Sequence, residues 1–566
     1  MRILFLVPVL VGAVSTLAFP QSTAPSAAAP ANSAASTEGR KVGRVEGVVM
    51  HSITNAPLGR ATVLLRPMGP AANSAPMVMV EGFNQMLPQD APSSGATAAD
   101  GKFVIENVPE GMYMPMASRT NFLTGYSGDR APLNTIKVTA GGTVKDVVFK
   151  LVPQGVISGR VTDAEGEPIQ NVMVAPARYV YNNGRSLSAM GMTQTNDLGE
   201  YRIANLAPGK YFLVAMQGMR PMAAAAGVRE AIPLTFYPNS LDANGASPIV
   251  VEPGADIRGM DFRLKRHAAV TISGKISGMP EGQFTAINLV PLDESLGQLG
   301  RMAPRFAPAQ GNRFVTTGVL PGTYELRADY RGGGKTNEML FGRLRVEVGN
   351  EDVKDLELVM SPGGEVTGSL RVEGDPLPNG YLMRVSLRGV DGMGFAQGQM
   401  EKDNTFRISN VAPGKYVVTM MAPPTHFIQS LKIDDREAGE QPIEVRGQSQ
   451  VKVDAILASG GGQITGTVEG PDGKPAANAF ISIHPVEGTS PMRQDREKTA
   501  PTDAKGSFTL KGVPPGSYRV FAWDSFGNGA WRDETLRKEN ETKSATVKLS
   551  ETGKEAVSLK VIPLPR

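Results

Sequence analysis

The chain contains no cysteine and very little histidine. None of its 566 residues is cysteine, and only four are histidine: His51, His267, His426 and His484. Without cysteine there are no disulfides, thiolate metal sites, cysteine nucleophiles or lipid attachments through a cysteine. Four histidines that lie singly in different parts of the chain offer no cluster of metal ligands. We therefore expect no metal, no cofactor and no catalytic residues.

The chain also lacks a large excess of charge of either sign. Its 58 Lys and Arg and 55 Asp and Glu leave a formal net charge of +3. Nucleic-acid binding through a basic surface requires a strong, clustered excess of Lys and Arg, so we expect no nucleic-acid partner. Glycine and proline are abundant instead, at 64 and 43 residues. Their share is above average but below that of disordered chains, which predicts a folded chain with many turns.

Only one long apolar run is present, and it lies at the N-terminus. Met1 and Arg2 are followed by apolar residues up to Leu17, and Thr16 and Ala18 are small residues at the positions that a signal peptidase reads. This predicts a cleaved signal peptide over residues 1–18. A membrane anchor is the alternative, but the run is shorter than the ~20 residues of a bilayer-spanning helix.

Residues 19–41 are rich in Ala, Ser and Pro, which is typical of a flexible linker. Together with the signal peptide, this segment predicts a protein that is secreted or periplasmic. No other stretch is apolar enough to span a bilayer, so we expect no transmembrane segment in the mature chain.

An eleven-residue block occurs five times. Every copy begins with an aromatic residue, has Gly at its ninth position and ends with Tyr. The residues at these three positions are Phe103, Gly111 and Tyr113; Tyr201, Gly209 and Tyr211; Phe314, Gly322 and Tyr324; Phe406, Gly414 and Tyr416; and Phe508, Gly516 and Tyr518. Agreement of this kind in five copies identifies an internal repeat.

The block is predicted to form two short strands joined by a turn. Asn or Gly at the fifth position favours a turn or bulge with positive φ, and the Pro-Gly region favours a tight reversal. After Tyr324, the charged residues Glu325, Arg327 and Asp329 alternate with apolar ones. This period of two is typical of a strand, with Tyr324 and its alternate neighbours facing the core.

Further short strands surround each block. A strand with a central glycine and an apolar strand precede it, and an alternating strand follows it. Units of roughly 100 residues, with closely spaced turns and no helical period, are typical of β-sandwiches. We predict an all-β chain, a tandem array of five Ig-like β-sandwich domains after the signal peptide, with short junctions that favour a beaded rod. The predicted domains, here numbered repeats 1 to 5, are residues 42–153, 154–266, 267–361, 362–459 and 460–566.

These recurring features resemble the carboxypeptidase regulatory-like domain. The features are the glycine-bearing first strand, the Gly-x-Pro turn (as in 166–168), the Asp-Gly turn (as in 100–101) and the block. The resemblance is strongest in repeats 1, 2 and 5, since repeat 3 lacks the Gly-x-Pro turn and repeat 4 lacks the Asp-Gly turn. It implies a transthyretin-like (prealbumin-like) β-sandwich, related to carbohydrate-binding-like modules, in a non-catalytic accessory role.

The name of this family prompts a search for a zinc peptidase site. His484 and Glu487 match the His-x-x-Glu pattern of zinc carboxypeptidases, but His484 is the last histidine of the chain. A further histidine ligand downstream is therefore missing. We interpret His484 as a histidine at a strand end, beside a surface glutamate. The frequent methionines and the Asp-Gly turns are explained by packing and turn chemistry, without copper or calcium.

Repeat 5 contains both tryptophans, Trp523 and Trp531, with Phe521 and Phe526 close by. If Tyr518 and its alternate neighbours face the core, Phe521 and Trp523 face outward. Exposed apolar side chains often mark contact sites, and sugar rings stack on aromatic faces. These four residues are therefore a candidate carbohydrate-binding site. The alternative is that they pack against repeat 4 or against the C-terminal tail of repeat 5.

These observations favour a non-catalytic exported protein of the cell envelope that acts as a binding or spacer scaffold. Its partner would be a polysaccharide or another envelope protein. Two alternatives remain: polysaccharide binding through the repeat 5 aromatics, and an accessory or remnant of an exported peptidase. Insertions at 67–98 and 218–246 are either binding loops or variable loops without a ligand.

Overall fold

The computed structural model describes most of the chain from Val42 onward. The predicted signal peptide (1–18) and linker (19–41) lie outside the described residues. The described ranges are 42–68, 77–80, 85–88, 94–123, 135–181, 185–217, 229–280, 283, 285–293, 296, 299–302, 305–332, 339–378, 381, 383–391, 394–423, 425–438, 442–487, 496–525 and 529–564.

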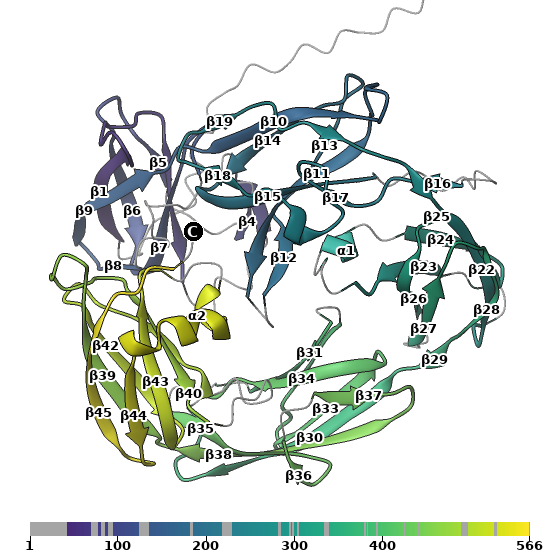
Figure 1. Cartoon of the computed structure of the whole chain (residues 1–566). Coiled ribbons are helices and arrows are strands. Elements are labelled where there is room, and N and C mark those ends of the chain that lie inside the picture. The colour runs from purple at the N-terminus through teal and green to yellow at the C-terminus, as the bar shows by residue number, and fades with distance from the viewer. Residues whose placement is uncertain are drawn as a thin grey trace, which may run out of the picture.

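The fold is an all-β tandem array of β-sandwiches (Figure 1). In each repeat, the glycine-bearing strand, here called the central strand, lies between two other strands of the first sheet. It pairs antiparallel with the first strand of the block and parallel with the last long strand of the repeat. The central strands and their two neighbours are β1 (Val42–His51) with β6 (Lys102–Pro109) and β9 (Thr143–Leu151); β10 (Gly155–Thr162) with β14 (Glu200–Leu206) and β19 and β20 (Asp256–Ile257, Phe262–Arg263); β22 (Val270–Ser277) with β25 (Arg313–Val319) and β28 (Val353–Val359); β30 (Gly364–Glu373) with β33 (Thr405–Val411) and β38 (Gln450–Ser459); and β39 (Gly462–Glu469) with β42 (Ser507–Val513) and β45 (Lys554–Lys560).

The second sheet of each repeat pairs the apolar strand with the second strand of the block. These pairs are β2 (Thr62–Pro67) and β7 (Gly111–Ser118); β11 (Val172–Val180) and β15 (Gly209–Gln217); β23 (Ala286–Pro291) and β26 (Gly322–Arg331); β31 (Arg384–Gly389) and β34 (Gly414–Met420); and β40 (Phe480–Pro485) and β43 (Gly516–Trp523). The two block strands thus lie in different layers of the sandwich. The predicted tight reversal is wrong in this respect, because the turn carries the chain from one layer to the other.

Shorter strands extend these sheets. In repeat 3, β24 pairs with both β23 and β25 and thereby joins the two layers into one sheet. The remaining strands are β3 (Met77–Val80), β4 (Gln85–Pro88), β5 (Ser94–Ala96), β8 (Ile136–Val138), β12 (Ser186–Ala189), β13 (Thr193–Gln194), β16 (Glu230–Ala231), β17 (Thr235–Phe236), β18 (Ile249–Val251), β21 (His267–Ala268), β24 (Arg305–Gln310), β27 (Met339–Val348), β29 (Ser361–Pro362), β32 (Phe395–Gln399), β35 (His426–Ile433), β36 (Arg436–Glu437), β37 (Ile443–Val445), β41 (Thr499–Pro501) and β44 (Ala545–Leu549). The helices are α1 (Leu299–Met302), α2 (Glu534–Glu539), η2 (Ala243–Gly245), η5 (Ala530–Arg532) and η6 (Glu541–Lys543).

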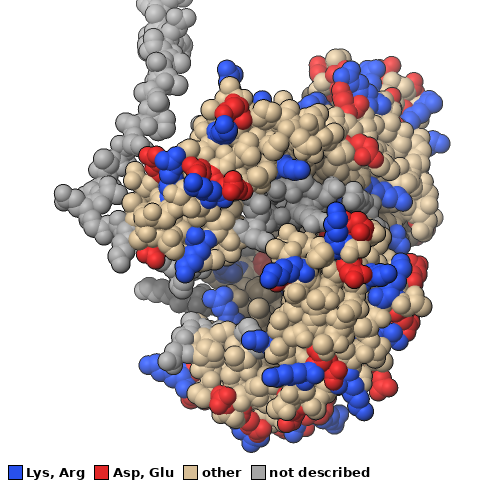
Figure 2. Space-filling view, turned by 90° about the vertical axis from the view of Figure 1, so that its left-hand side faces the viewer, with Lys and Arg blue, Asp and Glu red and all other residues tan. Residues whose placement is uncertain are grey.

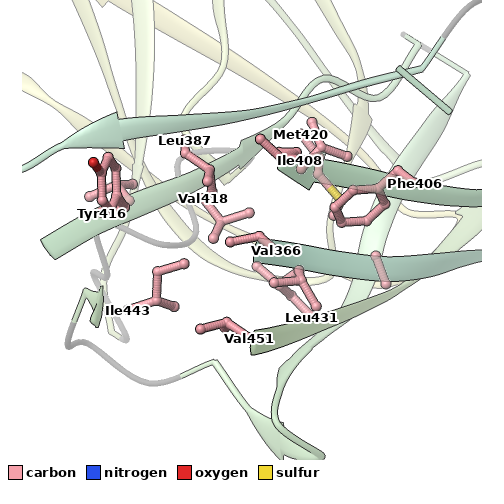
Figure 3. Packing of buried hydrophobic residues seen from close by; sticks show 14 of the residues in the cluster. Val366, Leu387, Phe406, Ile408, Tyr416, Val418, Met420, Leu431, Ile443 and Val451 are labelled. Carbon is pink, nitrogen blue, oxygen red and sulfur yellow. The ribbon is translucent and has the colours of Figure 1, made fainter. Parts of the chain in front are cut away.

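A separate hydrophobic core fills the space between the two sheets of each repeat. Figure 3 shows the core of repeat 4, where side chains from the two layers point toward one another. Tyr416 and Val418 of β34 face Val366 of β30 and Val451 of β38. In repeat 3, Leu326 and Ala328 are buried, while Glu325, Arg327 and Asp329 point to the other face, as the alternation predicts.

The glycine of each central strand lies where two other groups come very close. A Cβ atom added to Gly368 would lie 1.8 Å from the carbonyl oxygen of Val453 and 2.6 Å from the ring of Phe406. The same crowding by the parallel strand recurs at Gly47, Gly159, Gly274 and Gly466. Only glycine therefore lets the final strand and the first aromatic of the block pack against the central strand at these distances.

The last tyrosine of the block makes the same hydrogen bond in all five repeats. Its hydroxyl donates to the backbone carbonyl oxygen four residues earlier, at 2.8–2.9 Å. Between these two residues, the chain crosses from the first sheet to the second. The fifth residue of the block has a positive φ, as predicted, in Asn107, Asn205, Gly318, Asn410 and Gly512. This is a tyrosine corner, which fixes the crossing between the layers of a sandwich.

The five repeats follow one another around a closed course rather than along a rod (Figure 1). The first sheets lie on the outer side of this course, and the second sheets lie toward its middle. Tyr181 of repeat 2 packs against side chains of repeat 5. The expectation of a beaded rod is therefore wrong. Lys and Arg are interspersed with Asp and Glu on the face in Figure 2, in keeping with the small net charge.

We expect Gly368→Ala to destabilise repeat 4 by about 1–3 kcal/mol, because the new methyl group must displace backbone of β38. Hydrogen exchange of the β30 and β38 amides in the full chain measures this. Gly349→Ala is the matched control, since a Cβ at Gly349 meets no atom within 4 Å. Equal exchange rates in the wild type and Gly368→Ala would contradict the close approach.

We expect Tyr518→Phe to lower the stability of repeat 5 by about 1–3 kcal/mol, because a buried carbonyl loses its hydrogen bond. Thermal unfolding of the full chain, followed by tryptophan fluorescence, reports on this repeat. The control is Tyr381→Phe, whose hydroxyl bonds the carbonyl oxygen of Met421 at an exposed position and is worth less. A larger effect at Tyr381 than at Tyr518 would argue against the importance of the corner.

Candidate functional site

The aromatic residues of repeat 5 lie on the predicted face of their strand but are not exposed. Phe521 and Trp523 project from β43 away from the main core, and Trp531 lies in η5. Their exposed fractions are 1%, 0% and 1%. Phe526 lies outside the described residues. The prediction that Phe521 and Trp523 present their rings to solvent is therefore wrong.

A second, smaller hydrophobic cluster encloses these rings, which we call the repeat 5 cluster. The C-terminal segment runs alongside β43, with the N–H of Ile562 donating to the carbonyl oxygen of Ala522 at 2.7 Å. The side chains of Ile562 and Leu564 cover Trp523, and Tyr181 of repeat 2 packs on the same cluster. Packing against the tail of repeat 5, the alternative from the sequence, is what the structure shows. The buried members of the cluster are Phe521, Trp523, Ala530, Trp531, Ile562 and Leu564.

A short helix, α2, helps to cover the cluster. Asp533 caps its N-terminus, with Oδ1 accepting a hydrogen bond from the N–H of Leu536 at 2.8 Å. Glu534 lies in the first turn, and Arg537 and Lys538 lie in the last, which matches the helix dipole. We predicted no helix in this region. The signal was present in the order of cap, acid and bases, but six residues are too few to show a helical period.

A chain of hydrogen bonds crosses the repeat 5 cluster. Nε1 of Trp523 donates to Oγ of Ser482 at 2.9 Å, and Oγ lies 3.0 Å from Nε2 of His484. Nδ1 of His484 lies 3.1 Å from a carboxylate oxygen of Glu497. A carboxylate only accepts, so Nδ1 carries the hydrogen and Nε2 accepts from the serine hydroxyl. The arrangement satisfies the indole N–H, the hydroxyl and the imidazole together.

His484 is therefore not a surface histidine, and its acidic partner is not Glu487. The imidazole is buried, between the rings of Phe521 and Trp531 at centroid distances of 6.0 and 5.7 Å. Glu487 is exposed, and the carboxylate beside the imidazole comes from Glu497. The His-x-x-Glu pattern thus has no metal-binding geometry. No group of three or more His, Asp or Glu side chains within the described ranges is placed to hold a metal ion.

Burial and nearby charges determine how this pair titrates. Burial lowers the pKa of His484, Glu497 opposes that shift, and the positive charges of Arg537 and Arg532 add to it. Burial raises the pKa of Glu497, but the hydrogen bond from His484 and the two arginines outweigh it and hold the pKa below its usual value. Near neutral pH, the pair therefore consists of a neutral imidazole and a carboxylate.

Ser482, His484 and Glu497 have the order of groups found in serine hydrolases, where the acid orients the histidine and the histidine activates the hydroxyl. The serine of a hydrolase must reach its substrate, whereas Ser482 is 0% exposed. Its oxygen also already accepts from Trp523. The network is thus a satisfied structural one that joins β40, β43 and the chain near β41.

The outer face of the second sheet takes part in contacts in other repeats as well. In repeat 2, Phe212, Val214 and Met216 point away from the core, yet they are buried. Leu299 of α1, in repeat 3, packs on them. In repeat 3, Arg327 of the equivalent face pairs with Asp391 of repeat 4 at 2.7 Å. The same face therefore provides the surfaces through which neighbouring repeats pack.

One family model matches the chain, over two of its repeats. The family model of the carboxypeptidase regulatory-like domain matches residues 156–264 and 463–550, which lie in repeats 2 and 5. A search of curated proteins found no match to the chain.

Several solved structures resemble parts of the chain at low identity. The Bacillus anthracis TIE protein is 11% identical, with 72% of this chain and 74% of that chain covered and a TM-score of 0.15. The minor pilin GBS52 of Streptococcus agalactiae is 13% identical, with 40% and 96% covered and a TM-score of 0.21. The major pilin subunit BcpA of Bacillus cereus is 10% identical, with 72% and 99% covered and a TM-score of 0.13.

We expect repeat 5 to lose stability as the pH falls below about 6.5, the usual pKa of histidine. The unfolded chain then binds a proton that folded His484 resists, so the free energy of unfolding decreases. The lowered pKa of Glu497 extends this loss to still lower pH. Thermal unfolding at pH 7.5 and 5.5, followed by tryptophan fluorescence, measures the effect.

The matched variants for this pH prediction are His484→Gln and His267→Gln. The first removes the buried group and should reduce the difference between the two pH values, whatever its effect on stability at pH 7.5. The second removes an exposed histidine and should leave the difference unchanged. A His484→Gln protein with the full wild-type pH dependence would show that another group is responsible.

Proposed function

We propose that this chain, two of whose repeats are carboxypeptidase regulatory-like domains, is a non-catalytic scaffold of the cell envelope. In this role, the sandwiches hold partner-binding surfaces at fixed positions relative to one another. The observation that carries the proposal is that the five sandwiches have separate cores, and that side chains beside the second sheets join repeat 2 to repeat 3, repeat 3 to repeat 4 and repeat 2 to repeat 5. A set of independent domains on flexible linkers would not need these contacts.

The contacts between repeats support a rigid arrangement. Leu299 of repeat 3 is 0% exposed because it fills a hydrophobic cluster of repeat 2. The same two repeats are joined by an ion pair between Arg229 and Asp352 at 2.8 Å. Arg327, whose side chain is mostly buried, joins repeat 3 to Asp391 of repeat 4. Apolar packing supplies most of the stability here, while the ion pair, in which Arg327 is mostly buried and Asp391 is exposed, fixes the geometry of the contact.

Export of the protein is part of the proposal and rests on the sequence of residues 1–18. The described part of the chain has no helix long and apolar enough to cross a membrane. A tether of some twenty residues, 19–41, separates the leader from the first sandwich. Absence of cysteine fits an exported protein that folds without disulfide formation.

The two alternative functions have less support. Polysaccharide binding by the repeat 5 aromatics requires rings that a sugar can reach, and Phe521, Trp523 and Trp531 are enclosed by the chain itself. A peptidase requires ligands for a metal or an accessible nucleophile. The described residues offer no metal-ligand group, and Ser482 is closed off.

Cell fractionation and turnover assays test the proposal together. We expect the protein in the envelope or medium fraction, shortened by its leader, and no hydrolysis of peptide, ester or glycoside probes above buffer. Ser482→Ala is the decisive control, because Ser482 belongs to the arrangement that most resembles a catalytic one. Turnover that Ser482→Ala or a chelator abolishes would overturn the non-catalytic role, and recovery from the cytoplasm alone would overturn export.

A glycan pull-down with the full chain distinguishes the scaffold role from polysaccharide binding through the repeat 5 aromatics. If the wild type is retained on polysaccharide and the folded Trp523→Ala and Trp531→Ala proteins are not, the result would favour carbohydrate binding through these tryptophans. We expect neither substitution to change retention directly, since both rings are buried. We expect both to destabilise repeat 5, by about 3–5 kcal/mol for removal of a buried tryptophan side chain. Circular dichroism of each variant shows whether the comparison is between folded proteins.

A further inference from the structure

A hollow with a volume of about 630 Å³ lies in repeat 2, beside the junction with repeat 3. Arg263, Lys265 and His267 line it together with polar and apolar groups of the segment around β17. Its size is within the range of ordinary ligand pockets, which is roughly 300–1,000 Å³. It is remote in sequence from the aromatic residues of repeat 5 and takes no part in their network.

The alternation of the chain brings the three basic side chains to one side. Phe262 and Leu264 are buried in the core of repeat 2, whereas Arg263, Lys265 and His267 are exposed. In an extended chain, alternate residues point to opposite sides. Three successive donor groups therefore line the same hollow, at the spacing of every second residue.

Within the described residues, the positive charges of Arg263 and Lys265 have no acidic partner. None of the described residues that line the hollow is acidic, and the ion pairs found within the described ranges include neither Arg263 nor Lys265. The acid on the neighbouring strand is Glu230, which opposes Ala268 in the pairing of β16 with β21. It therefore projects from the face of this ribbon opposite to that of His267.

Two hydrogen bonds hold the hollow in shape. The side chain of Arg263 donates to the carbonyl oxygen of Ala164, and its backbone N–H donates to Oδ1 of Asn239 at 3.0 Å. Because Oδ1 of Asn239 is the acceptor, its Nδ2 group is the donor end of the amide. Pro233 and Leu241 provide apolar surface beside these donors. The arginine is thus positioned before any ligand arrives, which reduces the entropy cost of binding.

We propose that this hollow binds an acidic sugar, a carbohydrate unit that carries a carboxylate or sulfate group. The oxyanion is recognised by Lys265 and His267 with Arg263, the ring hydroxyls by Asn239, and the C–H face of the ring by Pro233 and Leu241. A lone inorganic anion would leave most of 630 Å³ unfilled. The proposal is independent of the scaffold role, because the site consists of residues of repeat 2 and the first residue of repeat 3 and does not depend on how the other repeats are arranged.

Isothermal titration of the full chain tests this with four probes: a uronic-acid disaccharide, a sulfated disaccharide, a neutral disaccharide of the same size, and inorganic phosphate. We expect binding of at least one acidic sugar that weakens as the salt concentration rises, and no measurable binding of the neutral sugar. Which acidic probe binds more tightly identifies the oxyanion. Failure of both acidic sugars to bind, or equal affinity for inorganic phosphate, would overturn the proposal.

Lys265→Gln is the informative variant, because Lys265 is exposed and its loss should not disturb the fold. We expect the affinity for the acidic sugar to fall about tenfold or more, the usual effect of losing one charged hydrogen-bond donor. Lys210→Gln removes a lysine that is also exposed in repeat 2 but lies outside the hollow, and it should bind as the wild type does. Wild-type affinity in Lys265→Gln, with unchanged thermal stability, would show that the sugar binds elsewhere.

Discussion

The hydrogen bond from the block tyrosine to the carbonyl four residues earlier is the constraint on which each sandwich depends. It closes the short segment in which the chain leaves one sheet and enters the other. Shortly before this segment, the fifth residue of the block has a positive φ, at the point where the first block strand shifts register against the central strand. The tyrosine ring is itself part of the core. One side chain thereby fixes the crossing between the two block strands and fills part of the space between the layers.

The glycine of the central strand is the second half of the same arrangement. Because it has no side chain, the first aromatic ring of the block lies directly on the central strand, and the final strand approaches from the other edge. The two features together specify three strands of one sheet and one strand of the other. They leave the outer face of the second sheet unspecified. The residues on that face differ between repeats: repeat 3 has the charged Arg327, repeat 2 has aliphatic and aromatic side chains around Phe212, and repeat 5 has the stacked rings of Phe521 and Trp523.

The sequence allowed those parts of the fold to be predicted whose causes are local. The strands of the block and the positive φ at its fifth residue follow from patterns within the eleven residues, and the facing and the all-β fold follow from short alternating segments beside the block. The carboxypeptidase regulatory-like resemblance agrees with the family model for repeats 2 and 5. The burial of Phe521 and Trp523 could not be predicted in the same way, because the side chains that cover them come from the last residues of the chain and from Tyr181 of another repeat. Alternation distinguishes the two faces of a strand, but it does not show whether other parts of the chain cover the face that points away from the core. An apolar side chain on each face was the available signal of burial on both.

The partner of His484 shows the same limit on a smaller scale. Glu487 is near in sequence but exposed, while Glu497 reaches the imidazole from the chain that leads into the neighbouring strand β41. Only the pairing of strands reveals such a neighbour. Similarly, the alternation of basic and apolar residues up to Lys265 predicts only a strand, and it does not indicate that the basic side chains line a hollow. Their meaning depends on the segment around β17, which forms the opposite wall.

The parallel pairing of the first and last long strands of a repeat has a mechanical consequence. In repeat 4, β30 and β38 lie side by side along residues Glu365–Glu373 and Gln450–Ala458. Since they run in the same direction, the chain enters the repeat at one end of this pair and leaves it at the other. A force that pulls on the two ends slides the strands past each other and loads all their hydrogen bonds at once, instead of opening them one after another. The same long parallel pairing recurs in repeats 1, 3 and 5, so a pull on the two ends of any of these repeats also loads the paired strands in shear.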